Sequence, residues 1–397
     1  MFNTLFISEN LSENSHTDDT ISGVEANVNL IEKINYTEMY ETNGKIYFEK
    51  YILKKIEEKN VELLIFAIGA GMIIDIFFLK KISECFDLKI ITMFSDSEHL
   101  FESNDRYYAQ TSDLTWLLSP STEELFNLYD INSVWTQGFD KNRYPKKELT
   151  KSIDISFIGG INRSNRLEYI DFLRENGINV ELAGYGTDRG LISVEEKNEI
   201  VYKSKINLNF TGVENEDKKI FKRVKQPKGR PMEISMLGGF TLSEYSYGIE
   251  KMFDVNKEID IFHDKEELLE KIKFYLANEK SLEEKAQCAY NRAFREYETN
   301  NSFLKVLDAL EKIKYVNKTY FIDDNFAKRF TSTRFYYMTK FLIIGELKAS
   351  FDEIKTIIKY KNITFKNFYF DIPRGIFHVL DKKIIYTRKI VNFLRTK

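Results

Sequence analysis

Arg230 and Glu233 have the residue types and spacing that most favour ligand binding in this chain. They lie three positions apart at the start of a predicted helix that ends at a glycine pair, so they share one helix face. A carboxylate there can accept hydrogen bonds from the vicinal hydroxyls of a ribose, and a guanidinium one turn away suits a diphosphate. The same spacing also fits an ion pair within the helix, which contributes only about 0.3–0.5 kcal/mol.

Two predicted strands that precede this helix end in glycines. IDISFIGG (153–160) is followed by two arginines, and NVELAGYG (179–186) ends in a turn with alternating glycines. Glycine lets backbone N–H groups approach an anion, and guanidinium groups bind phosphate oxygens as a fork. Tight turns with solvated arginines would produce the same pattern. The candidate residues for binding a nucleotide here are Gly159, Gly160, Arg163, Arg166, Gly184 and Tyr185.

Three acid–base candidates follow the predicted strand LKIITMFS (88–95), namely Asp96, Glu98 and His99. One of them could act as a general base or orient an acceptor hydroxyl. A capped loop with a solvated histidine is the structural alternative. Glu244 comes just past another short apolar strand, where a water-exposed carboxylate gains little, so we expect it to face a cleft.

These candidates require elements that bring them together. Apolar strand patterns alternate with helical patterns over residues 1–145 and again over 146–315, which predicts parallel βαβ units. The polar, proline-containing segment 140–152 is typical of a linker, and a long polar loop is expected between residues 9 and 46. In open parallel sheets, ligands bind beyond the carboxyl ends of the strands. The prediction is an α/β protein with two Rossmann-like domains facing a cleft.

The composition is that of a globular protein, with 43% hydrophobic and 30% charged residues among 397. A net charge of −3 offers no chain-wide basic field, so we expect no nucleic-acid partner. Cys85 and Cys288 form no zinc-ligand spacing with the four histidines and no disulfide framework, which favours a reducing, cytoplasmic location without a bound metal. The start of the chain lacks the basic residues and long apolar run of a signal peptide.

The apolar run at 63–78 is interrupted by two glycines and an aspartate. It falls short of the ~20 apolar residues of a membrane span, so we expect a buried strand, a turn and a helix. Its GAGMIID segment (69–75) has no third glycine at the spacing of a dinucleotide-binding fingerprint. A dinucleotide-dependent oxidoreductase is therefore disfavoured.

Residues 316–397 differ in charge from the rest of the chain, with 17 Lys/Arg against 7 Asp/Glu, alongside 17 aromatic residues. The first 315 residues accordingly sum to −13, and a break of this size marks a domain boundary near Tyr315. We expect a mainly helical extension that docks on the acidic remainder, forms a homo-oligomer, or contacts a membrane surface such as the inner membrane face.

From Ile153 to about Tyr297 the chain resembles the donor-binding domain of GT-B glycosyltransferases. The CgeB-like (spore maturation protein-like) branch of the group 1 transferases is the most similar. The residues that carry the resemblance are DISFIGG, NR with YIDFLR, VELAGYG, YKSKINLNF, MEI with MLGGFTLSEY, and GIEKMF. Met232 stands where this branch has an aromatic residue, and Ser243 where it has threonine.

The resemblance implies roles for several residues. Glu233 would hold the donor ribose, Arg230 would face the diphosphate, and Glu244 would contact the sugar. The backbone that would cradle the phosphates belongs to Tyr247, Gly248 and Ile249. Group 1 transferases often carry a second glutamate eight residues before the ribose-binding one, but Lys225 stands there in this sequence. Their catalytic details and stereochemistry therefore do not carry over.

The expected reaction transfers a sugar from a nucleotide-diphosphate sugar to a hydroxyl of a glycan, lipid-linked or protein acceptor, in bacterial surface-glycan or glycoprotein synthesis. We expect a hexosyltransferase that needs no cofactor and no metal, because protein cations would stabilise the departing diphosphate. Those cations are Arg163, Arg166, Lys222, Arg223, Lys225 and Arg230. The alternative is a catalytically inactive nucleotide-sugar-binding or scaffold protein of the same fold, which the missing acid at position 225 favours.

Overall fold

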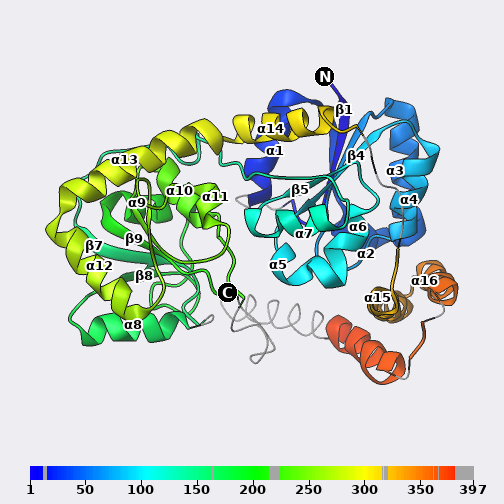
Figure 1. Cartoon of the computed structure of the whole chain (residues 1–397). Helices are drawn as coiled ribbons and strands as arrows, with labels where there is room; N and C mark the ends of the chain where they lie inside the picture. Colours follow the sequence, from blue (N-terminus) through cyan, green and yellow to red (C-terminus); the bar gives the residue numbers. More distant parts are fainter. Residues whose placement is uncertain are drawn as a thin grey trace, which may run out of the picture.

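The computed structural model describes residues 1–11, 16–162, 165–213, 224–314, 316, 321–360, 362–364 and 366–380. Within this part, the chain forms two parallel β-sheets flanked by helices, and further helices lie beside the N-terminal domain (Figure 1). The predicted arrangement of two Rossmann-like domains with a helical C-terminal extension is confirmed.

The N-terminal sheet has the strand order β2-β1-β3-β4-β5-β6, and all its pairings are parallel. Its strand β3 is buried along its whole length, because helices cover both faces of a parallel sheet. The strands are β1 (Asn3–Ser8), β2 (Asn29–Asn35), β3 (Leu63–Ala67), β4 (Lys89–Phe94), β5 (Leu114–Leu117) and β6 (Ser133–Trp135). The helices are α1 (His16–Asn27), α2 (Tyr36–Asn43), α3 (Lys45–Lys59), α4 (Ile76–Cys85), α5 (Ser97–Leu100), η1 (Phe101–Asp105), α6 (Arg106–Ala109), η2 (Pro120–Thr122) and α7 (Glu123–Leu128).

The predicted long polar loop after β1 is wrong, because α1, β2 and α2 lie within it. The sequence of α1, HTDDTISGVEAN, has no clear apolar stripe, and the helix is held by packing against α14 (Thr299–Glu311). β2 is the edge strand of the sheet, so its side chains are mostly half-buried and its apolar alternation is weak. The strand–turn–helix prediction for 63–78 is confirmed by β3 and α4.

The second sheet has the strand order β11-β10-β9-β7-β8 and is also fully parallel. Its strands are β7 (Ile153–Ile158), β8 (Glu181–Ala183), β9 (Ser204–Asn209), β10 (Thr241–Glu244) and β11 (Asp260–Phe262). Its helices are α8 (Arg166–Glu175), α9 (Val194–Lys203), α10 (Arg230–Met236), α11 (Ile249–Met252), α12 (Lys265–Ala277) and α13 (Glu279–Glu296). These elements follow the predicted alternation closely.

The chain returns to the N-terminal domain after α13. Phe139 N–H donates to Tyr297 O at 2.8 Å, and Thr299 N–H donates to Phe139 O at 3.2 Å. Beyond this crossing, apolar side chains of α14 such as Phe303 and Val306 enter the core of the N-terminal sheet, and α14 lies beside α1 (Figure 1). The last helix of the predicted 146–315 domain therefore packs with the first domain, which local patterning along the chain does not specify.

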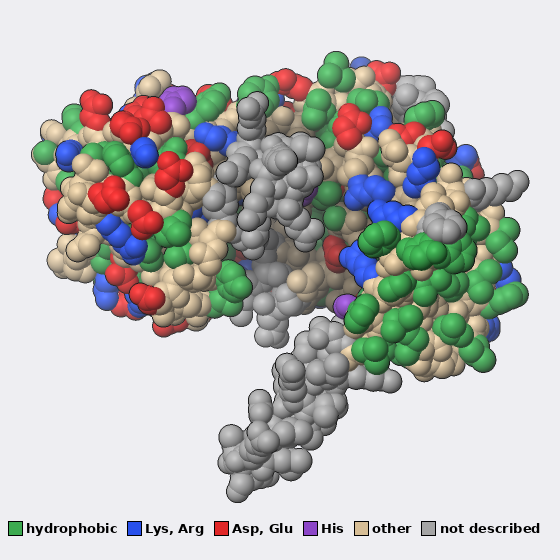
Figure 2. Space-filling model, turned by 90° about the horizontal axis from the view of Figure 1, so that it is seen from below, with side chains coloured by type: hydrophobic (Ala, Val, Ile, Leu, Met, Phe, Trp, Pro, Cys, Tyr) green, Lys and Arg blue, Asp and Glu red, His purple; other side chains and the backbone are tan. Residues whose placement is uncertain are grey.

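The C-terminal extension contains α15 (Asp324–Ile344), α16 (Leu347–Tyr360), η4 (Asn367–Asp371) and a further helical segment at 372–380. Figure 2 shows apolar side chains gathered over it, whereas the two Rossmann-like domains present mixed charges. In the described part of the chain, no helix has the length and apolar character needed to cross a bilayer.

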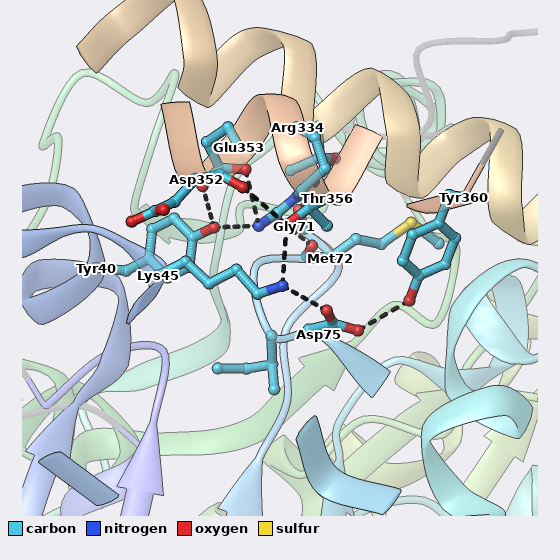
Figure 3. Close-up of polar contacts among 12 residues, drawn as sticks. Tyr40, Lys45, Gly71, Met72, Asp75, Arg334, Asp352, Glu353, Thr356 and Tyr360 are labelled. Carbon is cyan, nitrogen blue, oxygen red and sulfur yellow. Dashed lines mark hydrogen bonds and ion pairs between the residues drawn. The ribbon is translucent and has the colours of Figure 1, made fainter. Parts of the chain in front are cut away.

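The extension docks through buried polar groups, which Figure 3 shows. Arg334 of α15 and Glu353 of α16 are both fully buried and lie 3.4 Å apart. Arg334 also donates to the hydroxyl of Tyr40 and, at 2.8 Å, to the carbonyl oxygen of Met72, while Tyr40 donates to Glu353. Burial raises the pKa of Glu353, and the Arg334 guanidinium opposes that shift.

A second polar group lies beside the first in Figure 3. Lys45 Nζ lies 2.5 Å from Asp75 Oδ2 and 3.0 Å from the hydroxyl oxygen of Thr356, and Tyr360 donates to Asp75 at 2.8 Å. Burial would raise the pKa of Asp75, but Lys45 and these hydrogen bonds hold it below its ordinary value. Of the three alternatives predicted for residues 316–397, docking on the rest of the chain thus corresponds to an observed contact.

Candidate active site

A cavity of about 420 Å³ opens at the carboxyl edge of the second sheet. It lies between the ends of β7 and β9, where the strand order reverses, which is the ligand position of open parallel sheets. Seven residues predicted from the sequence line it, two of them from the N-terminal domain. The lining residues are Asp96, His99, Gly159, Gly160, Arg166, Phe210, Gly212, Val213, Lys228, Gly229, Arg230 and Glu233.

Glu233 enters the cavity from the first turn of α10, whose start is set by the proline that follows Arg230. Its side chain is 7% exposed and forms an ion pair with Lys197 of α9. The first turn of α9 is fixed by a capping box between Ser193 and Glu196, which places Lys197 in the next turn. The buried Glu233 carboxylate therefore lines the cavity with a cation beside it.

Arg230 packs closely on the end of β7. A Cβ atom at Gly159 would lie 2.9 Å from Arg230 Nη1, so the glycine leaves the space that the guanidinium occupies. The Arg230 Cζ lies 5.9 Å from the centre of the Phe157 ring. Burial lowers the pKa of Arg230, and Glu233 opposes the shift. Arg230 makes no hydrogen bond or ion pair with any residue in the described ranges, which leaves its donors for an anion.

Arg166 has a different role at the same edge. Its Nη1 donates to Gly160 O at 2.8 Å and its Nη2 donates to Gly212 O at 3.2 Å. The side chain is therefore a clamp between the ends of β7 and β9, and it contributes positive charge to the cavity from a buried position. Burial lowers the pKa of the neighbouring Lys228, with Arg166 and Arg230 adding to the shift while Asp96 opposes it.

A second cavity of about 430 Å³ lies at the carboxyl edge of the N-terminal sheet, again where the strand order reverses. Glu9 follows β1 there, and a Cβ on Gly69 would lie only 1.2 Å from Glu9 Oε2, so the glycine makes room for this carboxylate. Burial raises the pKa of Glu9. Asp96, Lys228 and Gly229 line both cavities, so the two cavities adjoin each other at these residues.

Gln226 joins the two domains between the cavities. Its Nε2 lies 3.0 Å from Asp96 Oδ1, 2.9 Å from Glu98 Oε2 and 3.1 Å from the carbonyl oxygen of Ser95. The other oxygen of Glu98 accepts a hydrogen bond of 2.5 Å from Ser119. Glu98 is thus engaged within the structure. Asp96 accepts a further hydrogen bond from the Ser95 hydroxyl at 3.3 Å, and it lines both cavities.

His99 lines the donor-side cavity, and its backbone N–H donates to Asp96 O at 3.4 Å. Its Nδ1 atom is buried and has no hydrogen-bond partner among the residues that the structure describes. The residue as a whole is partly exposed, so both the acid–base role and the structural alternative stay open.

Glu244 does not take the predicted position. Its carboxylate is 1% exposed, accepts hydrogen bonds from Thr211 N–H at 2.9 Å and the Thr211 hydroxyl at 3.0 Å, and pairs with Lys225 at 3.0 Å. Glu244 therefore links Thr211, just after β9, to Lys225, and it is not among the lining residues of either cavity. The lysine at position 225 thus has a structural partner.

The residues of the predicted phosphate cradle line neither of these two cavities. The hydroxyl of Tyr247 donates to Glu124 of α7 at 2.8 Å, and Gly248 lies against Ser121 of the N-terminal domain, while Ile249 is buried. Tyr247 and Gly248 therefore contact the N-terminal domain in the described structure.

Gly184 packs against the backbone of Gly159, since a Cβ at position 184 would lie 2.6 Å from the carbonyl oxygen of Gly159. Tyr185 is 67% exposed and lines neither cavity. The prediction for Arg163 lies outside the described residues, as do those for Lys222 and Arg223.

Three residues at the site were not assigned by the sequence patterns, namely Lys197, Gln226 and Lys228. Pro227 and Gly229 flank Lys228 in the sequence and favour a turn there, but no pattern assigned a role to this side chain. No local signal pointed to Lys197, because its partner Glu233 comes from another helix.

Comparisons with known proteins bear on this geometry. Residues 164–308 match the family model described as glycosyl transferase-like. A search of curated protein sequences gave no match.

Several solved structures share the fold. HepE of Anabaena, solved with UDP and glucose, has a TM-score of 0.57 at 11% identity, covering 79% of this chain and 100% of HepE. Sucrose-phosphate synthase of Thermosynechococcus elongatus has a TM-score of 0.55 at 9% identity, covering 78% and 98%. A glycosyltransferase of Rickettsia africae has a TM-score of 0.55 at 12% identity, covering 79% and 98%. The CgeB-like branch stays a prediction, but this chain has the GT-B glycosyltransferase fold, and its residues 164–308 match the glycosyl transferase-like family.

Proposed function

We propose that this protein is a glycosyltransferase that moves a sugar from a nucleotide-diphosphate sugar to a hydroxyl acceptor. The observation that carries the proposal is the pair of facing cavities, one at the switch point of each sheet, with Asp96 and Lys228 lining both. A two-substrate transfer needs such an arrangement, because donor and acceptor must meet at one position.

The donor-side cavity has the chemistry for a nucleoside diphosphate. The Glu233 carboxylate would bind the ribose hydroxyls. The Arg230 guanidinium, which makes no hydrogen bond or ion pair within the described residues, would bind the diphosphate. As the bond between sugar and diphosphate breaks, negative charge grows on the leaving group. Preorganised cations such as Arg230 and Lys228 stabilise that charge without reorganisation, and we propose that this protein charge replaces a required metal.

The acceptor hydroxyl must lose a proton during the transfer. Asp96 is the carboxylate at the junction of the two cavities, and its Oδ1 is oriented by Gln226 at 3.0 Å. We assign Asp96 as the general base and place the acceptor in the N-terminal cavity. A hydroxyl of a glycan, a lipid-linked sugar or a glycoprotein fits this role, in line with bacterial surface-glycan or glycoprotein synthesis.

A panel of nucleotides and nucleotide sugars tests the proposal. We expect UDP-, GDP- or CDP-sugars to raise the melting temperature, and one of them to release its nucleotide in the presence of an acceptor panel, also with a metal chelator present. Stabilisation by NAD without stabilisation by any nucleotide sugar would refute the proposal. Binding of a donor without turnover for any acceptor would favour the inactive, sugar-nucleotide-binding alternative.

A further inference from the structure

The C-terminal extension exposes many large apolar side chains on its outer surface. In α16, Leu347, Phe351 and Ile358 are each more than half exposed, and together with Ile354 they recur at the spacing of one helix face. The helix thus carries its apolar stripe on the outside. On the face of the molecule that Figure 2 shows, apolar side chains gather over the extension.

The buried face of the same helix carries four polar residues beside Ala349 and Ile357. Ser350, Asp352, Glu353 and Thr356 point inward, where Glu353 meets Arg334 and Thr356 meets Lys45 (Figure 3). These polar contacts fix the orientation of α16, because turning the helix to bury its apolar stripe would leave Arg334 unpaired in the interior. The outward direction of the stripe is therefore built into the fold.

The apolar area extends beyond α16 into the following segment. Phe368, Tyr369 and Phe370 of η4 are each more than half exposed, as is Phe377 in the helical segment that follows. Contiguous apolar surfaces of this kind mark interaction sites in folded proteins. We call this surface, from Leu342 to Leu380, the outer apolar face.

Positive charge surrounds the outer apolar face. Between residues 342 and 380, the exposed charged side chains of the described residues are five cations and one anion, Glu346. The cations are Lys348, Lys355, Lys359, Lys366 and Arg374. The sequence that follows, 381–397, carries six further Lys/Arg and one Asp.

We propose that the outer apolar face binds the surface of an anionic lipid bilayer. Aromatic and aliphatic side chains would enter the boundary between headgroups and acyl chains, while the lysines meet the anionic headgroups. A second copy of this chain fits less well, because a twofold contact would place the same five cations against each other. The inference stands on this surface alone and does not depend on the proposed catalytic function.

Vesicle flotation of the full chain tests the proposal. We expect the protein to float with vesicles of phosphatidylcholine mixed with phosphatidylglycerol, to float less with phosphatidylcholine alone, and to be released partly by high salt. The variant Phe351→Ser/Phe377→Ser should reduce the partition coefficient by about tenfold or more, since two phenyl groups no longer leave water. Lys348→Glu/Lys366→Glu should reduce binding to the anionic vesicles selectively.

A matched control uses Leu128→Ser/Leu191→Ser, which removes two apolar side chains that are 79% and 83% exposed on the two Rossmann-like domains. We expect this control to float like the wild type, and all variants to keep its melting temperature. No flotation of the wild type at low salt would overturn the proposal. So would Phe351→Ser/Phe377→Ser binding that equals the wild type, or a wild-type dimer in sedimentation that this variant dissociates. Binding that depends only on residues 381–397 would overturn it as well.

Discussion

Replacing Glu233 with glutamine tests whether the Glu233 carboxylate binds the ribose of the donor. The side chain is 7% exposed, and glutamine keeps its shape while removing the carboxylate that Lys197 and the proposed ribose share. A hydrogen bond to a charged group stabilises by about 1.5–3 kcal/mol and a neutral one by about 0.5–1.5 kcal/mol. Replacing two charge-assisted hydrogen bonds to the ribose by neutral ones should cost about 2 kcal/mol of binding free energy. This corresponds to a dissociation constant for UDP that is roughly 30-fold higher.

Isothermal titration calorimetry with UDP measures this change directly. Glu258→Gln is a matched control, because Glu258 is also a buried carboxylate of the donor domain, 12% exposed and 2.5 Å from Arg292, but it does not line the cavity. We expect Glu258→Gln to lower stability and to leave the affinity for UDP unchanged. Glu233→Ala should lose more affinity than Glu233→Gln, with the fold intact.

The ribose assignment would be refuted by an unchanged affinity in Glu233→Gln. Equal losses in Glu233→Gln and Glu258→Gln would show that lost stability, not lost ligand contact, accounts for the effect.

Three further predictions concern the core of the docked extension and the edge of β7. Arg334→Met should lower the free energy of unfolding in urea by about 3 kcal/mol, because Glu353 stays buried without its cation, and adding Glu353→Leu should recover most of that loss; no recovery would contradict the reasoning. Burial, with Asp75 adding to it, raises the pKa of Glu49 from 4.5 to about 7. The folded protein therefore binds that proton more tightly than the unfolded chain, and its free energy of unfolding falls by up to about 3 kcal/mol as the pH rises from 4.5 to 7. The melting temperature of Glu49→Gln minus that of the wild type should therefore increase between pH 4.5 and pH 7. A difference that does not change with pH would contradict the predicted pKa shift. Gly159→Ala should weaken UDP binding about tenfold, since the new methyl group would overlap both Arg230 and the Phe157 ring on which Arg230 packs. Wild-type affinity in calorimetry would contradict this reasoning.

The general position of the donor-side cavity followed from the sequence. Continuous apolar strands predict a parallel sheet, and all strands of such a sheet end at one edge. Gly159 and Gly160 after one strand, and Arg230 and Glu233 at one helix start, were therefore expected to converge, and they line one cavity. The acidic segment after β4 was expected at the facing edge, where Asp96 is found.

Pairings between distant segments were decided only by the tertiary structure. Glu244 looked available at the end of its strand, but Thr211 and Lys225 occupy its carboxylate. Glu233 has the expected helix position, yet its ion pair is with Lys197 from a neighbouring helix. Side-chain partners of this kind depend on how helices and loops pack, and no local period encodes that.

The outer apolar face separates the two kinds of information most clearly. The sequence of α16 by itself determines an amphipathic helix, because its apolar residues recur every three to four positions. It does not determine which face is covered. That choice depends on Tyr40 and Lys45, which lie far away in the sequence, and on Arg334 of the preceding helix. These residues offer charge and hydrogen bonds to Glu353 and Thr356 on the covered face. Once Glu353 is paired there, the cost of an unpaired buried charge keeps the apolar face outside.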